Sequence, residues 1–264
     1  ENYGFVVTID SFLLQNTLFP YDSTMTNNTG WQYNVLSLRK GTEVSDSSLF
    51  LTAHYDCISN RLGFTDYAHF APGADDNASG VSALLEIARI INNNSIDQKH
   101  NIRIEFYAAE EIGMAGSDRR MYELSNPWNM CVMGDINLDM IGYSDNSDSA
   151  NKVCINYYDN SSWLTELTKK NTLLYSSLKT NLTKEYSTRS DSYSFYSWNL
   201  PAIFLSENVF SPYYHTPQDS SNYLNYNYMK QISSIALSVC YDIVTKPYYA
   251  VGLDDIAKQD VTLN

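Results

Sequence analysis

Histidines and acidic residues lie at the ends of several apolar segments, where they could bind metal ions together. His54 and Asp56 end the segment SLFLTAHYD, and Asp76 lies in PGADDNASG. Glu110 and Glu111 follow the apolar run IEFYAA. Two adjacent carboxylates repel each other, and a divalent cation is the commonest compensation for such a pair. The double glutamate therefore indicates a nearby cation, although a solvated acidic turn would fit the same two residues.

Asp139 in NLDMIGY and His215 in YYHTPQD complete this candidate set. A carboxylate two residues along a strand from a histidine shares its face and can fix its tautomer, so Asp56 is expected to orient His54. Taken singly, each motif also fits a simpler role, such as a strand-end hydrogen bond, a helix cap or a loop residue. Taken together, two histidines and three carboxylates suit zinc. Five ligands exceed the three that a single catalytic zinc takes, but they suit two ions ~3.5–4 Å apart that share a carboxylate.

The segments between these motifs alternate between strand-like and helical patterns. Strand-like runs cover residues 5–12, 33–39, 48–54, 102–108, 134–141, 152–158, 182–186 and 202–206, and helical spacing covers residues 80–92, 162–178, 192–198 and 226–244. This alternation predicts a three-layer α/β sandwich, with a central mixed but mostly parallel sheet of about eight strands flanked by helices. The first two strands are expected to form an antiparallel edge. Ligand sites in such sheets lie beyond the C-terminal ends of the strands, which is where the candidate residues fall.

Individual residues add details to this framework. Polar Arg103 and Glu105 predict that one face of the strand at residues 102–108 is partly solvated. His69 is expected to be a loop residue near the aspartate pair, and His100 is expected to lie on the surface between a helix and a strand. Neither of these two histidines is expected to bind metal.

Composition and charge narrow the classes of function. The 264-residue chain carries a net charge of −13, which disfavours nucleic acid as a partner. No apolar stretch reaches the ~18 residues that a membrane span needs. We expect one domain over residues 1–247 and a tail or linker over residues 248–264. None of the four cysteines forms a CxxC pair, so a cysteine zinc site is not expected, and their spacing leaves buried thiols or one disulfide open.

The five motifs are similar, in order and spacing, to those of a known family. AHYD, PGADDNASG, AAEEIGMAGS, NLDMIGY and YYHTPQD resemble the zinc exopeptidases with paired co-catalytic metals, which include the secreted bacterial leucyl-type aminopeptidases. Glutamate carboxypeptidase, glutaminyl cyclase and the transferrin receptor ectodomain are relatives. The resemblance extends from about residue 3 to about residue 246. It implies the α/β sandwich and two zinc ions per chain, for which manganese or cobalt could substitute.

The family pattern implies a metal-binding role for five residues of this chain. Asp76 would bridge both ions. Glu111 and His215 would complete one site, and His54 and Asp139 would complete the other. Each ion would then have three ligands from the protein, as a catalytic zinc requires.

The same pattern implies the reaction and its substrates. Glu110 would act as the general base in hydrolysis of the N-terminal peptide bond by a water held between the two zinc ions. Asp56 would orient His54, and Asp191, in TRSDSYSF, would lie near the site as a further acidic residue. Asp75 has no ligand role in this pattern. The substrates would be peptides or proteins with free N termini, which would lose one amino acid at a time.

Three alternatives stay open on the same scaffold. A glutaminyl cyclase would use one zinc, a carboxypeptidase would use a different specificity pocket, and a binding domain would have no catalytic activity. A serine hydrolase is disfavoured because the sequence has no GxSxG motif. The helix that usually precedes YGF in the family is expected to be missing or truncated. Acidity and the resemblance lead us to expect a secreted or cell-envelope protein of bacterial type. The sequence does not determine the oligomeric state, for which a monomer is favoured.

Overall fold

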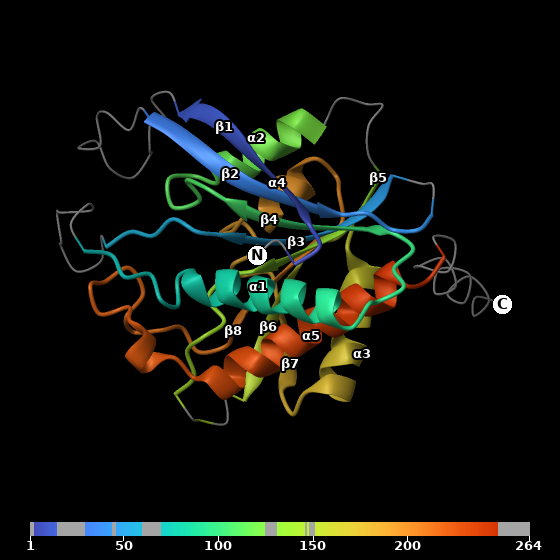
Figure 1. The fold of residues 1–264 in the computed structure, drawn as a ribbon. Helices are drawn as coiled ribbons and strands as arrows, with labels where there is room; N and C mark the ends of the chain where they lie inside the picture. Colours follow the sequence, from blue (N-terminus) through green and yellow to red (C-terminus); the bar gives the residue numbers. More distant parts are fainter. Residues whose placement is uncertain are drawn as a thin grey trace.

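An eight-stranded mixed sheet is the framework of the chain (Figure 1). The computed structural model describes residues 3–14, 30–43, 46–59, 70–124, 131–145, 147 and 151–247. The strands are β1 (Val6–Leu14), β2 (Gly30–Arg39), β3 (Ser47–His54), β4 (Asn101–Tyr107), β5 (Cys131–Leu138), β6 (Lys152–Tyr157), β7 (Lys179–Thr183) and β8 (Ala202–Glu207). Their spatial order is β1-β2-β4-β3-β5-β8-β6-β7. The four strands that end beside candidate residues, β4, β3, β5 and β8, are therefore neighbours at the centre of the sheet.

The central strands run parallel, and antiparallel pairs lie towards the margins. β3 pairs in parallel with β4 and β5, and β5 pairs in parallel with β8. β1 with β2 and β2 with β4 are antiparallel, which confirms the expected antiparallel edge. At the other margin, β6 is antiparallel to β8 and parallel to β7. Every residue of β3 is buried, as expected for a strand with both faces covered.

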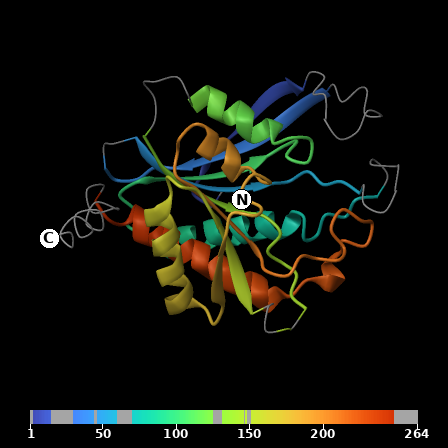
Figure 2. The same cartoon turned by 180° about the vertical axis from the view of Figure 1, so that it is seen from behind.

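Helices cover both faces of the sheet, as Figure 1 and the opposite view in Figure 2 show. One face carries α1 (Ala78–Asn93), α3 (Ser162–Tyr175) and α5 (Tyr226–Val244), and the other carries α2 (Ala115–Leu124) and α4 (Ser192–Ser197). Leu84, Leu164 and Ile235 of the first three helices belong to the larger apolar core. Met121 and Phe195 of the other two belong to a smaller core. The predicted three-layer sandwich is therefore confirmed.

The smaller core lies beside a buried ion pair. Glu105 of β4 is fully buried, and Arg120 of α2 donates two hydrogen bonds to its carboxylate, at 2.9 and 2.8 Å. The hydroxyl of Tyr107 donates to the same carboxylate at 3.0 Å. The prediction of a partly solvated face at Arg103 and Glu105 is wrong for Glu105, because α2 covers the strand there and supplies the opposite charge.

Most predicted elements are present with small shifts of their ends. The strand predicted at residues 134–141 is β5, which begins and ends three residues earlier, and the weak strand at residues 182–186 is β7. Helix α2 was not predicted. Its sequence, AGSDRRMYEL, holds four charged residues and few apolar ones, so the helical spacing of apolar side chains is weak there.

The remaining histidines and the cysteines give mixed outcomes. The prediction that His100 lies on the surface is wrong: the ring is buried, with Nδ1 2.6 Å from Ser47 Oγ and Nε2 2.7 Å from the carbonyl oxygen of Lys246. No disulfide joins the four cysteines, all of which are among the described residues. His69 and the tail at residues 248–264 lie outside the described part of the chain. Among the helices that are described, none is long and apolar enough to cross a membrane.

Candidate metal centre

The five ligand candidates converge where the central strands end. His54 is the last residue of β3, and Asp139 directly follows β5. Glu111 lies four residues beyond the end of β4, and His215 lies in the loop that follows β8. Asp76 lies two residues before α1, in the segment that follows β3. The parallel arrangement of neighbouring strands therefore brings together residues that are up to 161 positions apart in the sequence.

The side chains form two groups that share one aspartate. His54 Nε2 lies 3.1 Å from Asp76 Oδ1 and 3.3 Å from Asp139 Oδ1. His215 Nε2 lies 3.0 Å from Asp76 Oδ2 and 2.8 Å from Glu111 Oε2. Within each group, the three donor atoms all lie within 4.8 Å of one another. Each oxygen of Asp76 thus faces a different group, which is the arrangement that a bridging carboxylate needs.

These two groups fit zinc. Imidazole nitrogens and carboxylate oxygens are its ordinary ligands, and two such ligands at ~2.0–2.2 Å from a tetrahedral ion lie roughly 3.3–3.6 Å apart. The contacts across the two groups, 2.8–3.3 Å, are close to that spacing. Glu111 Oε1 is buried and has no hydrogen-bond partner among the described residues, so it has unused acceptor capacity at the site.

The electrostatics of the site favour a cation. Burial raises the pKa of Glu110 and of Glu111 well above the ordinary value for glutamate, and the charges of nearby carboxylates raise both further. Burial lowers the pKa of His54, but the charges of Asp139 and Glu110 outweigh burial and hold that pKa well above its ordinary value. The site thus holds several buried carboxylates close together, and their mutual repulsion is relieved when divalent cations bind between them.

Asp56 contacts both the first histidine and the double glutamate. Its backbone carbonyl oxygen lies 3.1 Å from His54 Nδ1, and its carboxylate Oδ1 lies 3.6 Å from the same nitrogen. The carboxylate accepts hydrogen bonds from the backbone N–H of Glu110, at 3.1 Å, and of Glu111, at 3.2 Å. Asp56 therefore fixes the position of the two glutamates as well as contacting the histidine ring.

The two glutamates lie in a turn, not on an extended strand. Ala109 has a left-handed φ of 60°, and the N–H groups of Gly113 and Met114 both donate to the carbonyl of Glu110 at 2.8 Å. A β carbon on Gly116 would lie 2.3 Å from the carbonyl oxygen of Ala108, so the turn requires glycine there. The reversal of direction at Ala109 places the two carboxylates in different surroundings.

Asn34 of β2 holds the two ends of this turn together, a role that the sequence analysis missed. Its Nδ2 donates to the carbonyl of Gly116 at 3.0 Å, and its Oδ1 accepts from the N–H of Ala108 at 3.1 Å. The side chain is fully buried. Its partners are more than 70 positions away, so only the packed structure reveals the contact.

A hydrogen-bond chain supports Asp139 from the side of α4. Ser190 Oγ donates to Asp139 Oδ2 at 2.6 Å, and Asn137 Nδ2 donates to Ser190 Oγ at 2.5 Å. Asp191, the further acidic residue expected near the site, is fully buried, and burial raises its pKa to about 7. Neither Asp191 nor Asp75 belongs to either donor group. Oδ1 of Asp75 instead accepts a hydrogen bond from the N–H of Gly142 at 2.8 Å.

Comparison with known proteins shows which family the chain belongs to. The sequence model of peptidase family M28 matches residues 34–240, which is most of the chain. The chain belongs to peptidase family M28. Aminopeptidase YwaD of Bacillus subtilis is 30% identical to this M28 chain over 223 residues, which cover 81% of the chain and 45% of YwaD. Leucine aminopeptidase 1 of Paracoccidioides brasiliensis is 29% identical, over 83% of the chain and 57% of its own length. The M28 chain thus spans about half the length of these curated relatives.

Solved structures share the fold of this M28 chain. A zinc aminopeptidase from Bacillus subtilis superposes with a TM-score of 0.72 at 26% identity, over 85% of this chain and 53% of the other. A glutaminyl cyclase from Bacteroides thetaiotaomicron, bound to N-acetylhistamine, has a TM-score of 0.69 at 22% identity. That likeness covers 90% of this chain and 84% of the cyclase, and at this identity it concerns the fold alone.

A row of aromatic rings leads from the surface of the M28 chain to the candidate metal centre. Tyr186 and Phe210 have ring centroids 5.9 Å apart, and Phe210 meets Tyr214 edge to face at 4.7 Å. Tyr214 stacks on the ring of His215 with centroids 3.6 Å apart. Tyr186 and Phe210 are 37% and 45% exposed, so this row offers an accessible apolar surface beside the metal ligands.

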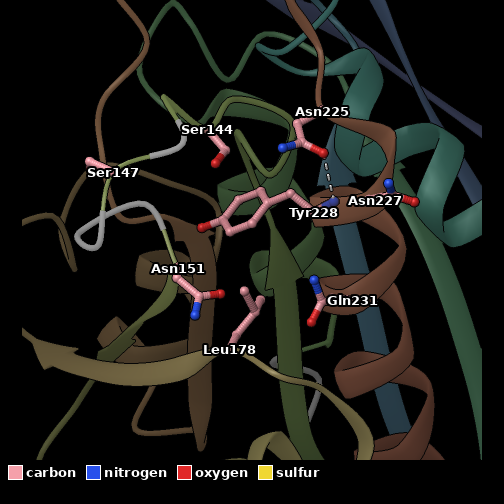
Figure 3. A pocket seen from close by; sticks show the side chains of 8 residues that line it. All are labelled: Ser144, Ser147, Asn151, Leu178, Asn225, Asn227, Tyr228 and Gln231. Carbon is pink, nitrogen blue, oxygen red and sulfur yellow. Dashed lines mark hydrogen bonds between the residues drawn. The ribbon is translucent and has the colours of Figure 1, made fainter.

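A cavity of about 250 Å³ lies elsewhere, at the N-terminal end of α5 (Figure 3). Its lining is mostly polar and consists of Ser144, Ser147, Asn151, Leu178, Asn225, Asn227, Tyr228 and Gln231. One of these residues caps the helix, because Asn225 Oδ1 accepts from the N–H of Tyr228 at 3.1 Å. None of the ligand candidates lines this cavity, so it is separate from the candidate metal centre.

Proposed function

We propose that this M28 chain is a metal-dependent aminopeptidase that removes single residues from the free N terminus of peptides or proteins. One observation carries the proposal: the two oxygens of Asp76 face two separate histidine–carboxylate groups. Glu110 belongs to neither group, but its charge interacts with those of His54, Asp139 and Glu111. Two three-donor groups with one shared carboxylate suit a pair of metal ions, and the extra carboxylate suits a proton-transfer role. The names of the relatives described above support the same reaction.

Two zinc ions are the metals that we propose for this centre. His54, Asp76 and Asp139 would hold one ion, and Asp76, Glu111 and His215 would hold the other. Zinc bound there supplies Lewis-acid chemistry, because it lowers the pKa of water and polarises a carbonyl group.

Proton transfer is the task of Glu110. Its carboxylate takes a proton from the attacking water and then gives that proton to the nitrogen of the leaving amine. Burial raises the pKa of Glu110, which makes its carboxylate a stronger base than an exposed glutamate. Asp56 keeps the group in place through the backbone N–H of Glu110, at 3.1 Å.

The aromatic row suggests which N-terminal residues are preferred. Tyr186, Phe210 and Tyr214 present apolar ring surface that ends at His215. A large apolar side chain of the first substrate residue would remove this surface from water. We therefore propose a preference for apolar over charged N-terminal residues.

Glutaminyl cyclisation is the second candidate. The fold likeness to the Bacteroides cyclase raises it, with a TM-score of 0.69, although a leucine aminopeptidase precursor from the same organism matches with the same TM-score. The two complete donor groups favour hydrolysis, because a cyclase of this kind is expected to use a single zinc. Metal content separates the two: two zinc ions per chain at saturation favour the aminopeptidase, and one favours the cyclase.

The deciding experiment is a substrate screen of the purified protein with metal analysis alongside. Amino-acid p-nitroanilides with a free amine should be hydrolysed, and the same compounds with an acetylated amine should not. Glutaminyl peptides should lose glutamine rather than form a pyroglutamyl ring. Cleavage of the blocked compounds alone, or ring formation without hydrolysis, would rule out the aminopeptidase proposal.

A further inference from the structure

Asp219 makes an unusual set of contacts with the segment that carries the shared ligand. Its Oδ1 accepts from the backbone N–H of Asp75 at 3.0 Å, and its Oδ2 accepts from the N–H of Asp76 at 3.1 Å. The N–H of Ala74 donates to the backbone carbonyl of Asp219 at 3.2 Å. Three consecutive amides are thus bound by one buried residue that lies more than 140 positions further along the chain.

Asp219 also belongs to the same hydrogen-bonded turn as His215. The N–H of Asp219 donates to the carbonyl of Thr216 at 3.1 Å, and Thr216 Oγ1 donates to the carbonyl of Tyr213 at 2.6 Å. Thr216 directly follows His215, so the carboxylate and the imidazole are held at a fixed offset. The contacts of Asp219 therefore set where His215 lies relative to Asp76.

The other histidine segment has the same design. Asp56, two residues after His54, accepts from the N–H groups of Glu110 and Glu111. Each histidine-bearing segment thus uses a nearby aspartate to bind two consecutive amides of a segment that carries an acidic ligand. Each carboxylate oxygen takes one charge-assisted N–H bond, and such bonds are stronger than neutral ones.

We propose that Asp219 is a positioning residue of the metal centre, which holds the backbone of Asp76 so that both of its carboxylate oxygens face their histidines. Asp219 is not itself a ligand, because its two oxygens are bound to amides and it belongs to neither donor group. This inference rests on the metal-binding part of the proposed function and is independent of the reaction that the centre performs. Residues that orient metal ligands typically change metal affinity by ~10–100-fold when removed.

The test is the zinc affinity of Asp219 variants, measured by competition with a chromophoric chelator and without substrate. Asp219→Ala should weaken zinc binding by about 10–100-fold, and Asp219→Asn, which keeps one acceptor oxygen, should lie between that variant and the parent protein. Asn225→Ala is the matched control: it removes the acceptor that caps α5 through the N–H of Tyr228. It should lower the melting temperature and leave zinc affinity unchanged.

Each outcome decides the inference. A folded Asp219→Ala protein that binds zinc as tightly as the parent would overturn it, and so would an equal loss of zinc affinity in Asn225→Ala. If Asp219→Ala does not fold, the affinity of Asp219→Asn decides, and an unchanged value overturns the inference. The parent protein could also bind zinc, lose affinity in the Asp219→Ala variant, and yet cleave no free-amine substrate. That result would support the positioning role and refute the aminopeptidase proposal. A parent protein that binds no zinc would overturn both.

Discussion

The two adjacent glutamates should respond in opposite ways to the same substitution. Glu110→Gln removes a carboxylate that belongs to neither donor group, while the backbone N–H of Glu110 can still donate to Asp56. Glu111→Gln changes a carboxylate whose Oε2 lies 2.8 Å from His215 Nε2 in one of the two groups. We therefore expect the first variant to lose turnover and keep its metal, and the second to lose metal.

The size of each effect follows from the role of the group. An amide cannot accept the proton, so Glu110→Gln should lower kcat by the ~10²–10⁴-fold that a positioned general base contributes. This loss corresponds to about 2.7–5.4 kcal/mol of activation free energy. Glu111→Gln exchanges one of three ligands of an ion, so affinity at that site should fall by more than the ~100-fold upper range for outer-shell residues. Binding at the group of His54, Asp76 and Asp139 should change less.

The assay combines kcat on leucine p-nitroanilide with zinc per chain measured by mass spectrometry after dialysis. Glu86→Gln on α1 is the control, because Glu86 is exposed and its ion pair among the described residues is with Arg89, at 2.6 Å, away from the site. It should match the parent protein in both measurements. If Glu110→Gln lost an ion while Glu111→Gln retained both, the assignment of the two glutamates would be reversed. If neither variant changed kcat or zinc content, the site itself would be misplaced.

Three further substitutions test other parts of the structure. Phe210→Ala should lower kcat/KM for leucine p-nitroanilide by about tenfold, because it removes an apolar contact surface for the substrate side chain. The effect on alanine p-nitroanilide should be smaller. An equal loss on both compounds would contradict the proposed preference for apolar residues. Arg120→Met should lower the free energy of unfolding by about 3–5 kcal/mol in urea titrations, because buried Glu105 loses the guanidinium that is hydrogen-bonded to it and keeps only Arg103, at 3.9 Å, as a cation nearby. Adding Glu105→Leu should restore most of the loss, and a double variant as unstable as the single one would refute this account. Burial raises the pKa of Asp135 well above its ordinary value, so its contribution to stability is lost as pH rises from about 4 towards the folded-state pKa. As pH rises across that window, the free energy of unfolding of Asp135→Asn should therefore increase relative to that of the parent protein by up to ~1.4 kcal/mol per pH unit. A difference between the two proteins that does not change with pH would argue against a raised pKa of Asp135.

Local patterns were enough to predict most of the sheet. β3 has an apolar centre, LFL, and α1 places apolar residues at helical spacing, so both were visible in the sequence. Their alternation implied parallel strands, and neighbouring parallel strands end at the same edge of a sheet. That rule is why residues as distant as His54 and His215 could be expected at one site.

Burial and long-range hydrogen bonding could not be predicted in the same way. His100 and Glu105 looked exposed because they are polar, yet each is buried against partners from other elements. Asn34 and Ser190 support the candidate centre through contacts more than 50 positions away in sequence. A hydrogen bond across such a distance leaves no periodic trace in the chain, since it depends on how the layers pack.

The double glutamate separates what the sequence determined from what tertiary structure decided. The sequence by itself supplied two adjacent carboxylates after a strand, within a set of motifs that pointed to metal binding. It suggested that they point apart because adjacent residues of an extended chain do so. In the structure they lie in a turn that begins at left-handed Ala109, and Asp56 binds both of their backbone amides. Which glutamate reaches the histidine of the second group is decided there, because only the folded chain brings Asp56 and His215 to that turn.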